Sequence, residues 1–281
     1  MREAVDNKSI LITGCSSGIG LCTAQALHER GYRVFASARK REDVQRLRER
    51  GLQSLHLDLT DSNSIQNAVK SVLQETGGTL YALFNNGAYG QPGAVEDLRR
   101  DVMRAQFETN FLGWLELTNS VLPVMREQGY GRIIQNSSIL GLVAMPYRGA
   151  YNASKFAIEG LSDTLRLELK LTSRNIHVVL IEPGPILTKF RDNSLLTLRE
   201  NIDIDHSFHR EYYQATIDRL SKEGPAVPFT LPPEAVMRRV IQALESTRPK
   251  ARYYVTFPTH LFGFLRRILP NRLMDNLARR F

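Results

Sequence analysis

Residues 9–20 read SILITGCSSGIG, a short apolar run followed by a glycine-rich turn. Residues 9–13 are apolar and β-prone, which is typical of a parallel strand that is buried on both faces. A helical stretch follows the turn and ends at Gly31, in the position where a glycine closes many helices. Because a helix N-terminus presents unpaired N–H groups, a strand, a glycine-rich turn and a helix in this order predict a dinucleotide site.

The glycines of this turn are Gly14, Gly18 and Gly20, spaced Gly-x-x-x-Gly-x-Gly rather than in the commoner Gly-x-Gly-x-x-Gly pattern. Glycine permits a tight turn and lets the backbone approach a phosphate closely. The alternative is an ordinary glycine-rich loop between a strand and a helix. The position of the turn, directly after a strand and directly before a helix, favours nucleotide binding.

The second predicted strand, residues 33–37, is followed by Ala38, Arg39, Lys40 and Arg41. Folds of this kind that bind NAD place an acidic residue here, where it bonds the ribose 2′-hydroxyl. This chain has no carboxylate at that point, and arginine matches a phosphate with two parallel hydrogen bonds. The sequence therefore predicts NADP(H), with Arg39 at the phosphate. Lys40 and Arg41 have the alternative of capping the strand end in solvent.

The alternation of strands and helices continues along the chain. Further strands are predicted at residues 54–58, 80–84, 131–136, 176–181 and 252–255, and helices at about 41–50, from 61, and at 98–125, 149–171, 207–222 and 232–247. Such alternation predicts right-handed crossovers and a parallel sheet. We expect an α/β fold, a single-domain Rossmann fold with a doubly wound, parallel, seven-stranded sheet and helices on both faces. The domain is expected to span residues 1–260, followed by a basic amphipathic tail over 261–281.

Composition narrows the function classes. The formal charge is +8, but no nucleic-acid-binding motif accompanies it, so no nucleic acid is expected as a partner.

The two cysteines, Cys15 and Cys22, are too few for a disulfide framework and suit a reducing compartment. No cluster of Cys and His residues predicts a metal site. The N-terminus has no apolar signal run, and no stretch of 18 apolar residues occurs. We expect a cytoplasmic protein.

Tyr151 and Lys155 are four residues apart and share one face of a predicted helix. A nearby ammonium favours the phenolate, so such a pair could exchange protons near neutral pH. The spacing also occurs by chance in many helices, so the pair gains meaning only from its context. Asn110 lies on another predicted helix among aromatic residues, where a buried amide needs hydrogen-bond partners.

These features together resemble the short-chain dehydrogenase/reductase family over about residues 8–256. The resemblance rests on Thr13-Gly14-x-x-x-Gly18-x-Gly20, Asn85-Asn86, Asn110, Ser138, Tyr151-x-x-x-Lys155 and Pro183-Gly184. The turn and the segment Glu182-Pro183-Gly184-Pro185-Ile186 look most like NADP-dependent members. Bacterial aldehyde reductases and retinol- and 17β-hydroxysteroid-dehydrogenase-like enzymes are the nearest groups.

The resemblance implies catalytic roles. Tyr151 is expected to donate the proton to a carbonyl oxygen in reduction and to accept it in oxidation. Lys155 is expected to lower the pKa of Tyr151 and to bond the nicotinamide ribose. Ser138 is expected to bond the substrate oxygen, and Asn110 to bond the main chain and hold a water that relays protons to Lys155. Ser137 is the rival to Ser138, and Tyr147 is the rival to Tyr151.

The resemblance also implies cofactor contacts. The expected contacts are Gly14, Ser16, Ser17, Gly18, Ile19, Gly20, Arg39, Asp58, Leu59, Asn86, Gly87, Tyr151, Lys155, Pro183, Gly184, Ile186 and Thr188. Among them, Ser16 could add a hydroxyl to the phosphate, and Asp58 could accept from the adenine amino group. The family usually has Asn-Asn-Ala-Gly after the fourth strand, whereas this chain has Asn85-Asn86-Gly87-Ala88. The exchange puts a Cβ at residue 88, which could shift the loop beside the cofactor.

In the family, the segment after Pro183-Gly184 is a substrate lid, here about residues 186–230. Its apolar side chains either line an apolar substrate pocket or pack the lid onto the domain. The resemblance implies an oxidoreductase that interconverts a small apolar aldehyde or ketone and its alcohol with NADP(H). A hydroxysteroid- or retinol-type dehydrogenase and a non-catalytic dinucleotide sensor are the alternatives. Family members usually form dimers or tetramers, so a homo-oligomer is expected.

The tail over residues 261–281 holds five arginines and one aspartate among apolar residues. Apolar rings beside arginines resemble a segment that lies at a membrane surface, which would give peripheral membrane contact. The alternative, which we favour, is a C-terminal helix docked on the lid or on a neighbouring subunit, with its arginines in water.

Overall fold

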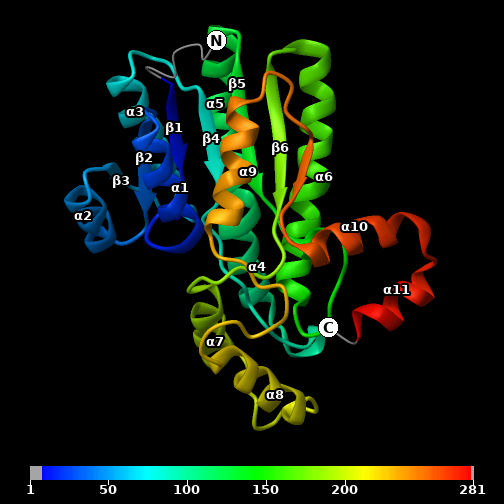
Figure 1. Cartoon of the computed structure of the whole chain (residues 1–281). Helices are drawn as coiled ribbons and strands as arrows, with labels where there is room; N and C mark the ends of the chain where they lie inside the picture. Colours follow the sequence, from blue (N-terminus) through cyan, green and yellow to red (C-terminus); the bar gives the residue numbers. More distant parts are fainter. Residues whose placement is uncertain (1–7, 280–281) are drawn as a thin grey trace.

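A single parallel sheet of seven strands organises the chain, in the order β3-β2-β1-β4-β5-β6-β7 (Figure 1). The computed structural model describes residues 8–279. The strands are β1 (Ser9–Ile12), β2 (Arg33–Ala38), β3 (Gln53–His56), β4 (Ala82–Asn85), β5 (Gly131–Asn136), β6 (Ile176–Glu182) and β7 (Arg252–Tyr254). The predicted fold class is confirmed. Strand β3 ends two residues earlier than predicted, which leaves Asp58 in the following loop.

Two layers of helices bury the two faces of the sheet. Side chains alternate along each strand, so Ile10 and Ile12 of β1 pack in one core while Leu11 packs in the other. The first core also takes side chains from α1 (Gly18–Glu29), α2 (Arg41–Glu49) and α9 (Glu234–Glu245). The second takes them from α3 (Ser62–Glu75), α5 (Gly113–Gln128) and α6 (Gly149–Thr172). Both strand faces are therefore apolar, as the continuous apolar run at residues 9–13 predicts.

The strand order creates a crevice at the carboxyl edge of the sheet. The chain builds the sheet outward from β1, first through β2 and β3 on one side and then through β4 to β7 on the other. The direction of the strand order therefore reverses between β1 and β4. Ligands of open α/β sheets bind in such a crevice. Two helices lie below this edge in Figure 1, α7 (Phe190–Asn201) and α8 (Arg210–Ser221). The helix predicted at 207–222 corresponds to α8, whereas α7 was not predicted.

The long helix predicted over 98–125 is a composite. It consists of α4 (Arg100–Phe107), a π-helical turn (Glu108–Leu112) and α5. Asn110 lies in the π-helical turn and is fully buried. Isolated π-helical turns inside α-helices recur at functional sites, because they re-aim one side chain.

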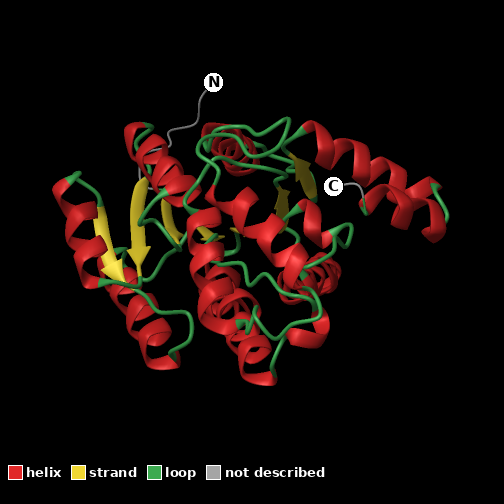
Figure 2. Ribbon diagram, turned by 90° about the horizontal axis from the view of Figure 1, so that it is seen from below, coloured by secondary structure: helices red, strands yellow, loops and turns green. Residues whose placement is uncertain are grey.

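The chain ends in α10 (Phe257–Ile268) and α11 (Asn271–Ala278), which project from one side of the molecule (Figure 2). The predicted boundary between residues 260 and 261 falls inside α10. Phe262 and Met274 are buried against the residues that follow β5, including Leu140. One face of this segment is therefore docked on the domain. Among residues 8–279, no helix has the length and apolar character needed to cross a membrane.

Candidate active site

A cavity of about 690 Å³ lies between the carboxyl edge of the sheet and the lid helices. It brings together residues that are distant in the sequence but were predicted to form one site. The predicted residues that line it are Gly14, Ser16, Ser17, Gly18, Ile19, Asn86, Gly87, Ser138, Tyr151, Lys155, Pro183, Gly184, Ile186 and Thr188. The glycine-rich turn and the Tyr151–Lys155 pair thus face the same space.

The remaining predicted residues lie outside this lining. Gly20 and Leu59 serve packing, because a Cβ on Gly20 would lie 2.3 Å from the Gly14 carbonyl oxygen and Leu59 packs against the backbone of Gly113. Arg39 is exposed at the end of β2, and Asp58 is half-buried after β3.

The glycine-rich turn has the conformation that a close backbone approach requires. Gly14 and Gly18 have φ values of +70° and +57°, in the left-handed region that favours glycine. A Cβ on Gly14 would lie 2.6 Å from the Gly87 Cα, so the two loops fit together only because neither residue has a side chain. Ser17 precedes α1 without capping it, and the first turn of α1 has no acidic residue. The free N–H groups of this helix end therefore fit the phosphates of a dinucleotide.

The loop after β4 is fixed to this turn by hydrogen bonds. The amide groups of Asn86 and Gly87 each donate to Thr13 Oγ1 at 2.8 Å, and Asn136 Nδ2 donates to Asn86 Oδ1 at 2.9 Å. Ala88 has no left-handed φ, and its methyl group packs against the second core. The Gly87-Ala88 order is thus accommodated without backbone strain.

Arg39 and Asp58 flank the crevice on the β2 side. Burial raises the pKa of the Tyr89 hydroxyl, and the nearby positive charge of Arg39 opposes this rise. Asp58 Oδ1 accepts hydrogen bonds from the amide and hydroxyl groups of Thr60, at 3.0 and 2.8 Å. Arg39 is thus an exposed cation at the end of β2, within electrostatic reach of Tyr89.

Tyr151 lies half-buried under the lid, with its hydroxyl beside the side chain of Ser138. Ser138 is held in turn by the amide of Leu140, which donates to Ser138 Oγ at 3.1 Å. Phe190 of α7 packs edge-on against the Tyr151 ring, with 5.3 Å between the ring centroids. Burial raises the pKa of Tyr151 above its ordinary value, against the smaller lowering effect of Ser138. Tyr151 is therefore a protonated hydroxyl, poised to donate.

Lys155 is fully buried behind Tyr151 and makes one hydrogen bond, from Nζ to the Asn136 carbonyl oxygen at 2.7 Å. Its Nζ also lies 4.6 Å from the Trp114 ring centroid and 5.4 Å from that of Tyr151. Burial lowers the pKa of Lys155 to about 7, although Glu159 opposes the change. Burial is the largest influence on both groups, and the lowering of the Tyr151 pKa by Lys155 stays a prediction.

Asn110 holds the main chain beyond β4 in place. Its Nδ2 donates to the Tyr89 carbonyl oxygen at 2.9 Å, and its Oδ1 accepts from the Tyr89 amide at 3.2 Å. Ser154 Oγ lies 3.4 Å from the same Nδ2, which ties the π-helical turn to α6. This agrees with the main-chain contact predicted for Asn110.

The rival residues occupy other surroundings. Ser137 lines the cavity, but its hydroxyl lies beside Glu159, away from Tyr151. Tyr147 lies outside the cavity lining and stacks on Tyr212 of α8, with ring centroids 5.0 Å apart, and its hydroxyl lies 3.2 Å from His209 Nδ1. The geometry therefore favours Ser138 and Tyr151.

A buried cluster of charges lies behind Lys155. Arg252 donates to Glu182 at 3.1 Å, to Glu159 at 2.9 Å and to Asp163 at 2.7 Å. Burial and the neighbouring Glu159 raise the pKa of Glu182 well above its ordinary value. This cluster joins β6, β7 and α6, as the predicted structural role of Glu182 implies.

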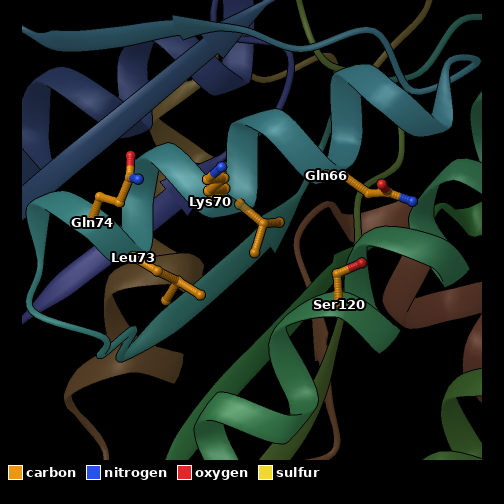
Figure 3. Close-up of a pocket in the computed structure, with 6 residues that line it drawn as sticks. Gln66, Lys70, Leu73, Gln74 and Ser120 are labelled. Atoms are coloured by element: carbon orange, nitrogen blue, oxygen red, sulfur yellow. The ribbon is translucent and has the colours of Figure 1, made fainter.

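A second groove of about 680 Å³ lies on the outer surface between α3 and α5 (Figure 3). Its walls come from Gln66, Val69, Lys70, Leu73 and Gln74 of α3 and from Ser120 of α5. Its lining has no acidic side chain and no aromatic ring, and it does not include Tyr151. Within residues 8–279, no group of three or more His, Cys, Asp and Glu residues is placed to hold a metal ion.

The sequence reasoning missed several residues that shape the cavity. Asn136 links Lys155 to Asn86, and Phe190 covers Tyr151. Arg148, Arg191 and Arg219 also line the cavity. Only Arg148 had a sequence signal, because it precedes Tyr151 by three residues and so lies one helical turn away.

Comparison with known proteins agrees with this geometry. The family model described as "short chain dehydrogenase" matches residues 8–198. The "Uncharacterized oxidoreductase YbbO" of Escherichia coli (strain K12) is 42% identical over 273 residues, covering 97% of this chain and 94% of that protein. The "NADPH-dependent 3-dehydrocapnine reductase" of Ornithobacterium rhinotracheale is 31% identical over 285 residues, covering 99% and 96%. A solved short-chain dehydrogenase/reductase from Burkholderia phymatum, in complex with NAD, has a TM-score of 0.78 at 22% identity, covering 98% of this chain and 96% of that one.

Proposed function

The chain belongs to the short-chain dehydrogenase/reductase family, and on that premise we propose that it is an NADP(H)-dependent oxidoreductase. It interconverts an apolar aldehyde or ketone and its alcohol. The observation that carries this proposal is the meeting of Ser138, Tyr151 and Lys155 with the glycine-rich turn around one cavity. A protein that only sensed the dinucleotide would not need the three polar side chains at the place where a carbonyl would lie.

The chain's own residues supply the proton and the orientation. When bound, NADP(H) supplies or accepts the hydride. Ser138 and Tyr151 present two hydroxyl groups that hold the substrate oxygen, and Tyr151 donates its proton to that oxygen in reduction. Lys155, whose Nζ lies 5.4 Å from the Tyr151 ring centroid, would bond a ribose hydroxyl and favour the return of the proton to Tyr151. Phe190 and the lid exclude water from the reacting atoms.

The preference for NADP(H) over NAD(H) rests on the end of β2. Arg39 stands where an acidic residue would select NAD, and it is exposed at the end of β2. A guanidinium there supports a 2′-phosphate contact, with Ser16 of the exposed turn as a second donor. The related reductase from Ornithobacterium rhinotracheale is described as NADPH-dependent, which is consistent with this choice.

The substrate side of the cavity is largely apolar. Leu140, Met145, Phe190, Val227 and Phe229 contribute side chains to its walls. Such a lining supports a substrate with a substantial hydrocarbon part. A hydroxysteroid or a retinoid fits the same description, and these stay as alternative substrate classes.

Two surface features support the proposed partners. Phe156, Leu167 and Leu171 are exposed on α6, which supports a homo-oligomer that pairs through this helix. On α10, an exposed apolar stripe runs along residues 257, 261, 264 and 268 beside two exposed arginines, Arg266 and Arg267. This second face supports peripheral contact of a cytoplasmic protein with an anionic membrane surface.

The direct test is a panel of aldehydes, ketones, retinoids and steroids, each assayed with NADPH and with NADH. We expect oxidation of NADPH by at least one apolar carbonyl class, with NADH weaker. The matching alcohol should support reduction of NADP⁺. Binding of NADPH without turnover of any carbonyl or alcohol in the panel would contradict the proposal and favour the sensor.

A further inference from the structure

The charged side chains that line the cavity all have one sign. They are Arg148, Lys155, Lys189, Arg191 and Arg219, and no Asp or Glu belongs to the described lining. Lys155 has a role in the proposed chemistry, and Lys189 is exposed. The three arginines remain to be explained, because a purely apolar substrate gives them nothing to bind.

Arg148 stands directly before α6, one helical turn ahead of Tyr151. Its Nη1 lies 2.8 Å from the sulfur of Met145, which is a weak acceptor for a guanidinium. Burial, and after it the nearby Arg219, lower the pKa of Arg148 to about 10. Within residues 8–279, no carboxylate pairs with it.

The other two arginines come from the lid. Arg191, on α7, donates to the Gly224 carbonyl oxygen, while its Nη1 is buried without a partner. The guanidinium of Arg219, on α8, has no hydrogen-bond or ion-pair partner among the described residues. Burial and the neighbouring Arg191 lower the pKa of Arg219. The lid thus brings two guanidinium groups to a third one on the body of the domain.

Unpaired, partly desolvated like charges are unfavourable, and proteins normally pair them. This chain does so elsewhere, where Arg252 pairs with Glu159 and Asp163. Arginine groups that converge on a cavity without acids are typical of sites for carboxylate, phosphate or sulfonate groups. The cluster therefore has the chemistry of an anion site whose ligand comes from outside the chain.

We propose that the substrate carries an anionic group, which Arg148, Arg191 and Arg219 bind while the carbonyl of the same molecule meets Ser138 and Tyr151. This inference rests on the proposed function and specifies its substrate class, an amphiphilic oxo compound with a hydrocarbon part and one anionic group. Because two arginines come from the lid and one from the body, the anion also fastens the lid over Tyr151.

The phosphates of the cofactor are the other source of negative charge in such a site. They have their own donors in the free end of α1 and in Arg39. Arg148 directly precedes α6, three residues before Tyr151, and Arg219 lies near it on α8, on the lid side of the cavity. The arrangement therefore assigns the arginine cluster to the substrate.

The test uses two probes with the same hydrocarbon chain, octanoate and its neutral counterpart octanamide. Binding of each to the full-length protein saturated with NADPH is measured by calorimetry, so no turnover is needed. We expect octanoate to bind about 10- to 100-fold more tightly than octanamide, the range given by charge-assisted hydrogen bonds. Arg148→Gln and Arg219→Gln should each remove most of this preference. Arg219→Lys should retain part of it.

Arg210→Gln is the matched control, because Arg210 lies on the same helix as Arg219 but is exposed and lies 3.9 Å from Asp205. It should leave the preference unchanged. Equal binding of the two probes to the wild-type protein would overturn the proposal. A preference for octanoate that survives in both glutamine variants would also overturn it. If the glutamine variants lost as much affinity for NADPH as for octanoate, the arginines would belong to the cofactor site and the proposal would fail.

The same probes separate this proposal from the proposed function. Tyr151→Phe keeps the arginine cluster and should bind octanoate as the wild-type protein does. If the carbonyl panel gives no turnover while octanoate is still preferred, the oxidoreductase assignment fails and the anion site stands. If turnover is found only with neutral carbonyls and octanoate is not preferred, the anion site fails and the oxidoreductase assignment stands.

Discussion

The side-chain nitrogen of Lys155 lies 2.7 Å from the carbonyl oxygen of Asn136, the last residue of β5. This contact anchors a fully buried amine whose pKa burial lowers to about 7, against the smaller effect of Glu159. In the unfolded chain the amine titrates near its ordinary value of 10.5. Between these two values the unfolded state binds more protons, so this group makes stability rise with pH.

Lys155→Met should therefore raise the free energy of unfolding at pH 7, by about 2 kcal/mol once the lost bond to Asn136 is counted. The gain should shrink as the pH approaches 10, and turnover should be lost. Thermal or urea unfolding across this pH range measures the effect. A variant less stable than the wild type at pH 7 would show that the ammonium stabilises the site. Lys170→Met, at an exposed position of α6, is the control.

Tyr151→Phe should reduce kcat by about 10²- to 10⁴-fold, the usual contribution of a general acid. The affinity for NADPH should stay within about two-fold, because the ring remains packed against Phe190. Steady-state kinetics and fluorescence titration with NADPH measure the two quantities. Tyr147→Phe is the control and should retain turnover, since Tyr147 stacks on Tyr212 outside the cavity lining. Full turnover by Tyr151→Phe would reject the mechanism.

Arg39→Asp should weaken the binding of NADPH by about 100-fold and leave that of NADH within about three-fold. The variant replaces a phosphate ligand with a group that repels phosphate and can accept from a ribose 2′-hydroxyl. Titration of the free protein with both cofactors measures the ratio. Arg41→Asp, at the start of α2, tests whether any cation here has the same effect. Equal losses in the two variants would point to general attraction by positive charge.

The fold could be predicted from the sequence because local signals repeat along the chain. The apolar runs mark the strands, and the glycines at 14, 18 and 20 mark the turn, since a Cβ at these positions would collide with Gly87, Thr188 or Gly14. Ser138, Tyr151 and Lys155 could be predicted because they keep a fixed spacing. The structure places all three in the lining of one cavity.

The lid could not be predicted to the same depth. Helix α7 has a mixed sequence with polar and apolar residues in short runs, so periodicity did not reveal it. Arg148, Arg191 and Arg219 are far apart in the sequence, and only the fold of the lid brings them together. The pKa values of Tyr151 and Lys155 also follow from burial, which residue spacing does not show.

Glu182→Gln should make stability less dependent on pH. Burial and Glu159 raise the pKa of Glu182 to about 9 in the folded state, against an ordinary value of 4.5. The folded state therefore binds more protons between pH 4.5 and 9, and stability falls as the pH rises through this range. Glutamine keeps the shape and the contact with Arg252 without ionising. The variant should match the wild type near pH 5 and exceed it near pH 8.5 in thermal unfolding.

Asp163→Asn is the contrasting control in the same cluster. Burial would raise the pKa of Asp163, but hydrogen bonds from Arg252 and Arg166 hold it below its ordinary value. The asparagine variant should therefore lose stability at neutral pH, and the loss should vanish as the pH falls through the ordinary carboxylate range. If Glu182→Gln were destabilising at pH 8.5, Glu182 would be ionised in the folded protein and would pair with Arg252.

The exposed stripe on α10 gives the last prediction. Phe264 and Ile268 lie on the outer face of the helix, while Phe262 is buried against the domain. Deleting residues 261–281 would uncover the core, so outward substitutions are the better test. Phe264→Asp combined with Ile268→Asp should leave the melting temperature unchanged and abolish sedimentation with vesicles that contain anionic lipid.

The control for this prediction is Leu171→Asp, which removes a residue that is 87% exposed on α6 and should leave vesicle binding unchanged. Binding should also weaken with salt, because Arg266 and Arg267 flank the stripe and their attraction to lipid phosphates is screened.

The end of α10 that begins at Phe257 borders the cavity, since Pro258 and Phe262 line it. A membrane contact there would place the cavity mouth beside a lipid surface, where an amphiphilic substrate would be concentrated. The membrane contact would be rejected if the wild type and the double variant bound vesicles equally, or if neither bound them. Helix α10 would then be a helix that is docked on the domain alone.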